Sequence, residues 1–471
     1  MFGRPAGRFR QHEGNPPLAT PPTNSPAPPG ARLAHGDPTG PIPLNAFQRI
    51  IRGWERVHPY NAAQAMEVRR PAVDPAAAAA AWAATLDEMK LGRVEARAIS
   101  YRHVGLNGEA ARYPLRVLPA GTSLDAFFAE EMNRPFADPG EPPFRPFLMP
   151  DPAAGTCHLG VVYQHWVADS VAVRHVLRRW LERLFLPPGQ HARRPIRHAG
   201  IGYFGLLGTA PGSLSAVQTV LSVIRRHLRY RRARKVRAHG PADYPVGVVL
   251  AESRGLVPAL VAAARNRGAK VNDLFLAAAA RACDARVPAQ ARRNRPDLAV
   301  ASIVDLRPLA RAALDDRFGL FLGFSEVVCR PADLRSADRL VATVAGQNRT
   351  HRHHGVWPAT VGWLAAALIA RPLVPPAKLY HFFRKEAPLT AGVSNVNLNR
   401  TWAGRHAADL LARYRRVSPT GPLAPVVFSV TTLGDDLQVS LTYRVALLTA
   451  DQARNLADAF LAELAALTGA G

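Results

Sequence analysis

The first half of the chain alternates between two hydrophobic periods, and this predicts an alternation of strands and helices. Short apolar runs bounded by turn-forming residues are typical of buried strands, and apolar residues three or four positions apart are typical of helices. We expect strands at 60–68, 96–104, 113–118, 146–149 and 157–163. We expect helices at 74–89, 123–132 and 168–184. Thr122 is the expected N-cap of the second helix, because its hydroxyl can accept a backbone hydrogen bond.

The second half of the chain repeats this mixture of periods. We expect strands at 246–251, 298–306, 318–329 and 426–443, the last of them folded into a hairpin at 434–436. We expect helices at 256–266, 272–284 and 449–467. The expected fold class is therefore α/β, with two halves of similar size, each a mixed sheet flanked by helices.

Two segments lack the regular pattern. Residues 1–45 are dense in Pro, Gly and small polar residues, so we expect a disordered tail and assign it no function. Residues 183–242 contain no Asp or Glu, and apolar positions three or four apart from 214 to 228 predict an amphipathic helix that becomes Arg-rich at its end. We expect a basic connector at 187–243, between subdomains at 46–186 and 244–471.

Charge narrows the classes of partner without choosing among them. The formal net charge of the 471-residue chain is +25, which suits nucleic acid, an anionic membrane surface, an acidic carrier protein or the phosphates of coenzyme A. The connector is either a solvated surface helix or a dock for a membrane or an acidic carrier. It contains no recognised nucleic-acid-binding module, so we disfavour nucleic acid as a partner.

Composition also bears on compartment and cofactors. The abundance of Ala, Arg and Pro is typical of GC-rich bacterial coding. The three cysteines form no CxxC pair, so we expect neither a disulfide framework nor a metal site, and a reducing cytoplasm is the natural compartment. The longest apolar stretch, 363–374, is interrupted by Arg371 and falls below the roughly 18 residues of a membrane span. We expect a cytoplasmic protein that is soluble or peripheral at the inner face of the membrane.

One His-x-x-x-Asp match stands out. His165 and Asp169 lie in the segment Gln-His-Trp-Val-Ala-Asp-Ser, after an apolar strand and before a helix. Strand ends that open onto crevices are where α/β sheets present chemistry. The sequence has 16 histidines, and a second match, His239 with Asp243, follows the basic connector with no strand before it. From spacing alone His165 is either a general base or a structurally bonded histidine, with Asp169 starting the helix.

Several segments in order resemble a known superfamily. Met-Asn-Arg-Pro-Phe-Ala-Asp at 132–138, Pro-Phe-Arg-Pro-Phe-Leu at 143–148 and the Gln-His-Trp-Val-Ala-Asp-Ser segment are similar to the condensation-domain and coenzyme A-dependent acyltransferase superfamily, with its His-His-x-x-x-Asp-Gly motif. Val-Asn-Asp at 271–273, Val-Asp-Leu-Arg-Pro at 304–308 and Val-Ser-Asn-Val at 393–396 resemble its wax ester synthase/diacylglycerol acyltransferase branch. The likeness covers about 45–469.

The resemblance implies two chloramphenicol-acetyltransferase-like subdomains with an active-site tunnel between them. His165 would be the general base that deprotonates an acceptor hydroxyl or amine, and general-base help is worth about 10²–10⁴-fold in rate. The donor would be an acyl-coenzyme A or acyl-carrier thioester, used as a co-substrate with no bound cofactor. Asp169 would be chiefly structural, and Arg307 is its expected salt-bridge partner, since a buried carboxylate needs one; the alternative for Arg307 is an ordinary surface arginine.

Other residues inherit substrate contacts from the resemblance. Gln164 stands where the motif has its first His, and Ser170 where it has Gly, so the local geometry departs from the family pattern. Ser394 and Asn395 would line the tunnel or stabilise an oxyanion, the alternative being a turn within a strand pair. Asn272 and Asp273 are expected to cap a core helix rather than touch substrate.

The function that these observations favour is transfer of an acyl group to an alcohol. A free-standing condensation enzyme that forms an amide is the main alternative. A catalytically silent relative that binds an acylated carrier or a lipid as a scaffold is the other, because Gln164 and Ser170 depart from the motif. We recognise no carrier, adenylation or thioesterase segment, so we expect such partners to act in trans.

Overall fold

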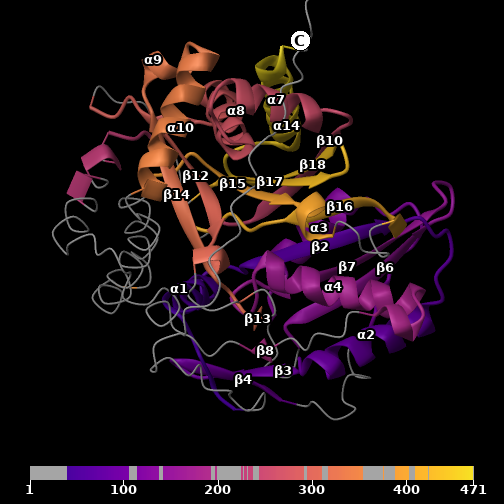
Figure 1. Cartoon of the computed structure of the whole chain (residues 1–471). Coiled ribbons are helices and arrows are strands. Elements are labelled where there is room, and N and C mark those ends of the chain that lie inside the picture. Colours follow the sequence, from indigo (N-terminus) through magenta and orange to yellow (C-terminus); the bar gives the residue numbers. More distant parts are fainter. Residues whose placement is uncertain are drawn as a thin grey trace, which may run out of the picture. The chain divides into compact units, whose positions relative to one another are not determined.

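Two sheets organise the computed structural model (Figure 1). The described residues are 40–104, 114–136, 142–191, 197–198, 224–225, 228–230, 232–236, 243–290, 294–309, 314, 317–353, 375, 388–402, 409–422 and 424–469. The first sheet has the order β16-β2-β7-β6-β5, and the second β10-β18-β17-β15-β12-β14. The mixed α/β architecture expected from the sequence is confirmed.

The first sheet is built from four strands of the first half and one strand, β16, of the second half, and all its pairs are antiparallel except β5 with β6. Its strands are β2 (Asn61–Val68), β5 (Arg116–Val117), β6 (Phe144–Asp151), β7 (Thr156–Gln164) and β16 (Leu411–Val417). Helices α2 (Pro75–Met89) and α4 (Ser170–Phe185) pack on each other, and Trp82 meets Trp180 edge-on at 4.9 Å between ring centroids. Because these helices share one apolar core with the sheet, the strand–loop–helix unit that carries the motif is anchored on both sides.

The helix ends of this half follow local capping chemistry. Asp74 caps α2 by accepting from the backbone N–H groups of Ala76 and Ala77. Helix α3 (Leu124–Asn133) is capped by Ser123. The expected cap, Thr122, is wrong by one residue, because its hydroxyl instead donates to the carbonyl of Pro119 within the preceding turn.

The second sheet mixes parallel and antiparallel pairs. Its strands are β10 (Val246–Ser253), β12 (Leu298–Asp305), β14 (Leu322–Cys329), β15 (Ala391–Asn397), β17 (Val426–Leu433) and β18 (Asp436–Arg444). Strand β15 is parallel to both its neighbours, β12 and β17. Helices α7 (Val257–Asn266), α8 (Val271–Arg286), α10 (Ala337–His353) and α14 (Ala450–Thr468) share its apolar core.

Strand β16 lies outside the subdomain that the sequence boundaries gave it. It falls within 244–471, yet it pairs antiparallel with β2 at the edge of the first sheet, as Figure 1 shows. Edge strands have unpaired backbone groups, and the strand from the second half satisfies those of β2. This exchange brings residues of both halves to the end of β7, where the motif lies.

Smaller elements complete the described chain. Short strands are β1 (Ile42–Pro43), β3 (Arg93–Ala96), β4 (Ser100–Val104), β8 (Arg197–His198), β9 (Lys235–Val236), β11 (Ala289–Gln290) and β13 (Arg317–Phe318). Short helices are α1 (Ala46–Glu55), α9 (Pro331–Leu334) and α13 (Leu398–Thr401), with 3-10 turns at Pro188–Gln190 and Arg307–Leu309.

Three expectations from the sequence concern the N-terminal tail, the strand at 96–104 and the basic connector. The tail boundary at residue 45 is too late, because β1 pairs with β4 and Asn45 caps α1. The strand expected at 96–104 is a hairpin of β3 and β4. Residues 1–39 and most of the expected connector helix lie outside the described residues. Within the described ranges, no helix is long and apolar enough to cross a membrane.

Candidate active site

The motif loop, residues 165–169, connects the end of β7 to the start of α4. The backbone N–H of His165 donates to the carbonyl of Tyr60 at 3.3 Å, and that of Val167 donates to Gln164 at 3.1 Å. Trp166 is buried, and Gln48 donates to its carbonyl oxygen. The loop is therefore held by backbone bonds on both sides before any substrate binds.

The imidazole of His165 is held through one of its two ring nitrogens. Its Nδ1 lies 3.0 Å from the carbonyl oxygen of Ala168. Since a carbonyl oxygen only accepts, we infer that Nδ1 carries the proton, and the neutral ring then presents the lone pair of Nε2. Burial lowers the pKa of His165, although the Ala168 carbonyl and Asp169 oppose the shift, so the ring is neutral near pH 7.

Two aromatic rings frame this imidazole. The ring of Tyr60 stacks on it at 5.8 Å between centroids and 11° between planes. Tyr163 meets it edge-on at 5.8 Å. The His165 side chain is half-buried, so these rings restrict its rotation while leaving part of it accessible.

Both carboxylate oxygens of Asp169 are hydrogen-bonded within the protein. Its Oδ1 accepts from the backbone N–H groups of Val171 and Ala172, each at 3.0 Å, and thereby caps α4. Its Oδ2 accepts from the backbone N–H of Phe321 at 2.9 Å. Burial opposes ionisation, but Arg307 and the backbone donors hold the pKa of Asp169 below its usual value. Asp169 is thus a positioning residue for the loop.

Arg307 lies against Asp169, the pairing that the resemblance implied. Its Nη1 and Nη2 donate to the two carboxylate oxygens at 2.8 and 3.0 Å, and both side chains are buried. Nη1 also meets Asp305 at 3.2 Å, and the guanidinium lies 4.8 Å from the ring centre of Phe321. Because Arg307 belongs to the second half, this ion pair ties the start of α4 to the second sheet.

The two motif departures lie at opposite ends of the loop. Gln164 is half-buried at the end of β7, opposite Asn61, and its backbone N–H donates to Pro143 at 3.0 Å. The carbonyl of Ser170 accepts from the amide of Gln64 at 3.2 Å. The hydroxyl of Ser170 is buried and has no partner among the described residues.

Ser394 and Asn395 lie within β15 and not in a turn, because they pair with Ser429 and Val430 of β17, beyond the point where the pairing with β12 ends. The hydroxyl of Ser394 accepts from Arg416. The side-chain oxygen of Asn395 is buried and has no partner among the described residues.

The Val-Asn-Asp segment starts α8. Asp273 accepts from the backbone N–H of Lys270 at 2.9 Å and from Asn348 at 2.7 Å. Asn272 donates to the hydroxyl of Ser302 at 3.1 Å. These contacts suit a helix-start role.

Sequence reasoning missed the polar cluster around Arg174 and Arg416. Both are more than nine-tenths buried. The one available signal was that Arg174 follows Ser170 by four positions on an otherwise apolar helix face. The cysteines are poor nucleophile candidates by contrast, since burial raises the pKa of the Cys157 and Cys329 thiols to about 12.

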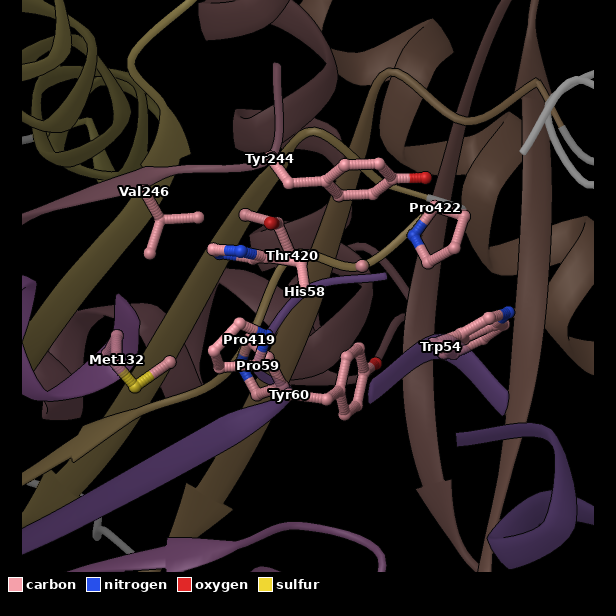
Figure 2. Close-up of a pocket in the computed structure, with 11 residues that line it drawn as sticks. Trp54, His58, Pro59, Tyr60, Met132, Tyr244, Val246, Pro419, Thr420 and Pro422 are labelled. Atoms are coloured by element: carbon pink, nitrogen blue, oxygen red, sulfur yellow. The ribbon is translucent and has the colours of Figure 1, made fainter. Parts of the chain in front are cut away.

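A pocket opens one ring away from His165 (Figure 2). It is partly open to solvent. Both halves line it, with Trp54, His58, Pro59, Tyr60, Met132, Tyr244, Val246, Pro419, Thr420, Gly421 and Pro422. Tyr60 is shared, because it faces this pocket and also stacks on His165.

Rings and prolines dominate this pocket. Trp54 lies beside Tyr60 at 5.3 Å between centroids, and His58 stacks under Tyr244 at 5.9 Å. Gly421 has φ +66, and a Cβ there would lie 2.5 Å from the Tyr60 ring, so the glycine lets the chain approach that ring. The lining suits an apolar group.

Comparisons with known proteins agree on the fold. The trichothecene 15-O-acetyltransferase of Fusarium sporotrichioides matches with a TM-score of 0.66 and 13% identity, over 90% of this chain and 94% of that one. The first condensation domain of the CDA synthetase matches with 0.63 and 15%, over 92% and 97%. The condensation domain of the monacolin K polyketide synthase matches with 0.61 and 12%, over 91% and 98%.

The comparisons by sequence found no match. No protein-family model matches the sequence, and no curated protein matches it. The chain therefore has the two-subdomain α/β fold of condensation domains and of an O-acetyltransferase, as expected. At these identities the likeness concerns the fold.

Proposed function

We propose that this protein is an acyltransferase that moves an acyl group from a thioester to an alcohol or amine, with His165 as the general base. The observation that carries the proposal is the bond from Nδ1 of His165 to the Ala168 carbonyl, which leaves Nε2 unprotonated in a neutral ring. Nε2 takes the proton of the acceptor as its oxygen or nitrogen attacks the thioester carbonyl. The tetrahedral intermediate then expels the thiolate, which receives that proton from the imidazolium.

The substrates are proposed by chemical class. The donor is an acyl-coenzyme A or an acyl carrier protein, since phosphates or an acidic surface suit a chain of net charge +25. The aromatic pocket beside Tyr60 would take an apolar part of either substrate. We favour ester formation on the resemblance of 271–273, 304–308 and 393–396 to the wax ester synthase branch.

Amide formation is the second candidate, and two of the structural neighbours named above are condensation domains. The same base serves both reactions, so only the acceptor distinguishes them. The test is a panel of alcohols and amines with acyl-coenzyme A donors and a loaded carrier protein. Free thiol release and product mass are measured together, so that hydrolysis is not mistaken for transfer.

The His165→Ala variant tests the base. We expect transfer to fall by about 10²–10⁴-fold with an unchanged circular dichroism spectrum and thermal midpoint. The matched control is His239→Ala, which removes the histidine of the other His-x-x-x-Asp spacing and should leave the rate unchanged. Undiminished transfer in His165→Ala would overturn the proposal. A native protein that binds acyl carriers but transfers to no acceptor would favour the scaffold alternative.

A further inference from the structure

A cluster of buried polar side chains lies beside the motif loop, on the side of the first sheet that α4 covers. Gln64 on β2 is its centre: its amide donates to the carbonyl of Ser170 at 3.2 Å, and its oxygen accepts from the hydroxyl of Tyr414 at 2.6 Å. Arg416 lies opposite Gln64 in the register of β16 and β2. Arg174 follows Ser170 by one helical turn, so both point to the same side of α4.

The cluster also reaches the second sheet. Arg416 donates to the hydroxyl of Ser394 on β15, next to Asn395. The cluster therefore contacts β2, β15, β16 and the start of α4, and the motif loop ends within it.

Both arginines have unused donors. Arg174 is 6% exposed and Arg416 is 2% exposed. Among the described residues, Nη1 of Arg174 and Nε of Arg416 have no hydrogen-bond partner, and neither guanidinium forms an ion pair. Asp169 attracts Arg174 but is already bonded by both oxygens to Arg307.

Such an arrangement is costly without an anion. Removing a cation from water costs several kcal/mol unless a partner compensates. Burial lowers the pKa of both guanidinium groups, that of Arg416 to about 10 with Arg174 contributing, so both stay charged at neutral pH. Two buried positive charges, one unused N–H group on each and the unpartnered hydroxyl of Ser170 are groups that a small anion would satisfy.

We propose that Arg174 and Arg416, with the Ser170 hydroxyl, bind a carboxylate group of the acceptor substrate. The acceptor would then be a hydroxy acid or an amino acid. Nη1 and Nη2 of Arg416 already donate to Val430 and Ser394, so Arg416 offers its Nε and Arg174 its Nη1. One free N–H from each guanidinium can serve one of the two oxygens of a carboxylate, and such charge-assisted bonds are the strong ones. The assignment to the acceptor rests on the proposed function, whereas binding of the anion does not require transfer.

Thioester chemistry points to the acceptor as the source of the charge. An acyl chain and the arm next to the thioester sulfur are uncharged, and the phosphates of coenzyme A lie at the far end of that arm. An anion held beside the motif loop therefore belongs to the molecule that attacks. The charge of Arg416 also acts on the imidazole of His165, so the anion and the base share one environment.

The test uses acid and amide pairs that differ only in charge. Hydroxy acids and amino acids of increasing chain length, each with its carboxamide, are titrated by calorimetry into the full-length His165→Ala protein, which binds without turnover. We expect at least one acid to bind about tenfold or more tightly than its amide. The preference should disappear in Arg416→Gln and Arg174→Gln, both in the same background.

Arg415→Gln is the matched control, because Arg415 is adjacent on β16 but pairs with Glu252. It should keep the preference for the acid. If Arg416→Gln does not fold, Arg174→Gln and Arg416→Lys provide the test, and each should weaken the preference because each removes one of the two free guanidinium N–H groups. Equal binding of acids and amides throughout the panel overturns the proposal, as does an equal loss in Arg415→Gln.

The two proposals fail separately. An arginine-dependent preference for acids, with no thioester consumed by the native protein, overturns the acyltransferase and leaves the anion site standing. Transfer to amides as fast as to acids, abolished by His165→Ala, leaves the acyltransferase standing and overturns the anion site.

Discussion

The motif loop and the cluster around Arg174 and Arg416 meet at the start of α4. They differ in how their buried charges are paired. In the loop, Asp169 and Arg307 satisfy each other, and backbone donors complete the carboxylate. In the cluster, Arg174 and Arg416 form no ion pair among the described residues, and each keeps a donor without a partner, as Arg307 does at its Nε. Both regions are buried to a similar degree. Neither burial nor a single unused N–H group therefore separates scaffold from binding site here; the presence of a buried carboxylate partner does.

The difference assigns roles within one short stretch of chain. A buried cation that is paired with a buried carboxylate fixes geometry, and a further anion adds little to it. A buried cation without a carboxylate partner gains from an anion that reaches it. Asp169, which the motif spacing pairs with His165, thus belongs to the scaffold, and Arg174, one helical turn beyond Ser170, belongs to the ligand side.

The largest expected effect on stability comes from breaking the ion pair of Asp169 and Arg307. Arg307→Met leaves Asp169 buried without its cation, and we expect a loss of about 3–5 kcal/mol in the free energy of unfolding. Urea denaturation followed by tryptophan fluorescence measures it. Asp169→Asn combined with Arg307→Met removes both charges and should recover much of that loss. A single variant as stable as the native protein would show that the pair does not hold the loop.

The sequence predicts this pair only through the order of motifs. Nothing in the spacing of Asp169 and Arg307, 138 positions apart, indicates contact. The fold class and most element cores are predictable, because apolar periods are local. The cap of α3 shifts by one residue because Thr122 and Ser123 both carry hydroxyls, and the preceding turn uses the first one.

Long-range pairing is what the sequence leaves open. β16 has the composition of a strand rich in arginine, and no local signal assigns it to the edge of the first sheet. That exchange places Arg416 opposite Gln64, so the arginine cluster could not be predicted without it. Ser394 and Asn395 were expected to contact substrate or to form a turn, and their place within β15 depends equally on partners distant in sequence.

A smaller effect on the free energy of unfolding, of opposite sign, is expected in the cluster around Arg174 and Arg416. Arg174→Met replaces an unpaired buried cation with an apolar side chain of similar length, and we expect the free energy of unfolding to rise by about 1–2 kcal/mol without ligand. The same urea experiment measures it, beside Arg178→Met on the same helix as the control. A clear loss of stability would mean that the guanidinium is bonded as firmly as Arg307, and the contrast between the two regions would fail.

The smallest effect links the two regions through the pH dependence of acyl transfer. Transfer needs a neutral His165, so the rate falls as pH falls through its pKa, which burial holds below the ordinary 6.5. The acid limb of kcat/KM should therefore lie below pH 6.5.

Arg416 also lowers the pKa of His165. Arg416→Gln removes this repelling charge, so it should raise the pKa of His165 and move the acid limb of kcat/KM to higher pH. Rates measured from pH 4.5 to 8 at constant ionic strength give the acid limb of the native protein and that of Arg416→Gln. Arg415→Gln, on the same strand, should leave the acid limb at the same pH. An unchanged acid limb in Arg416→Gln would mean that the guanidinium of Arg416 lies too far from the imidazole of His165 to bind the same substrate. Because Asp169 is held by Arg307 and keeps its charge across this range, the shift reports on the cluster and not on the scaffold.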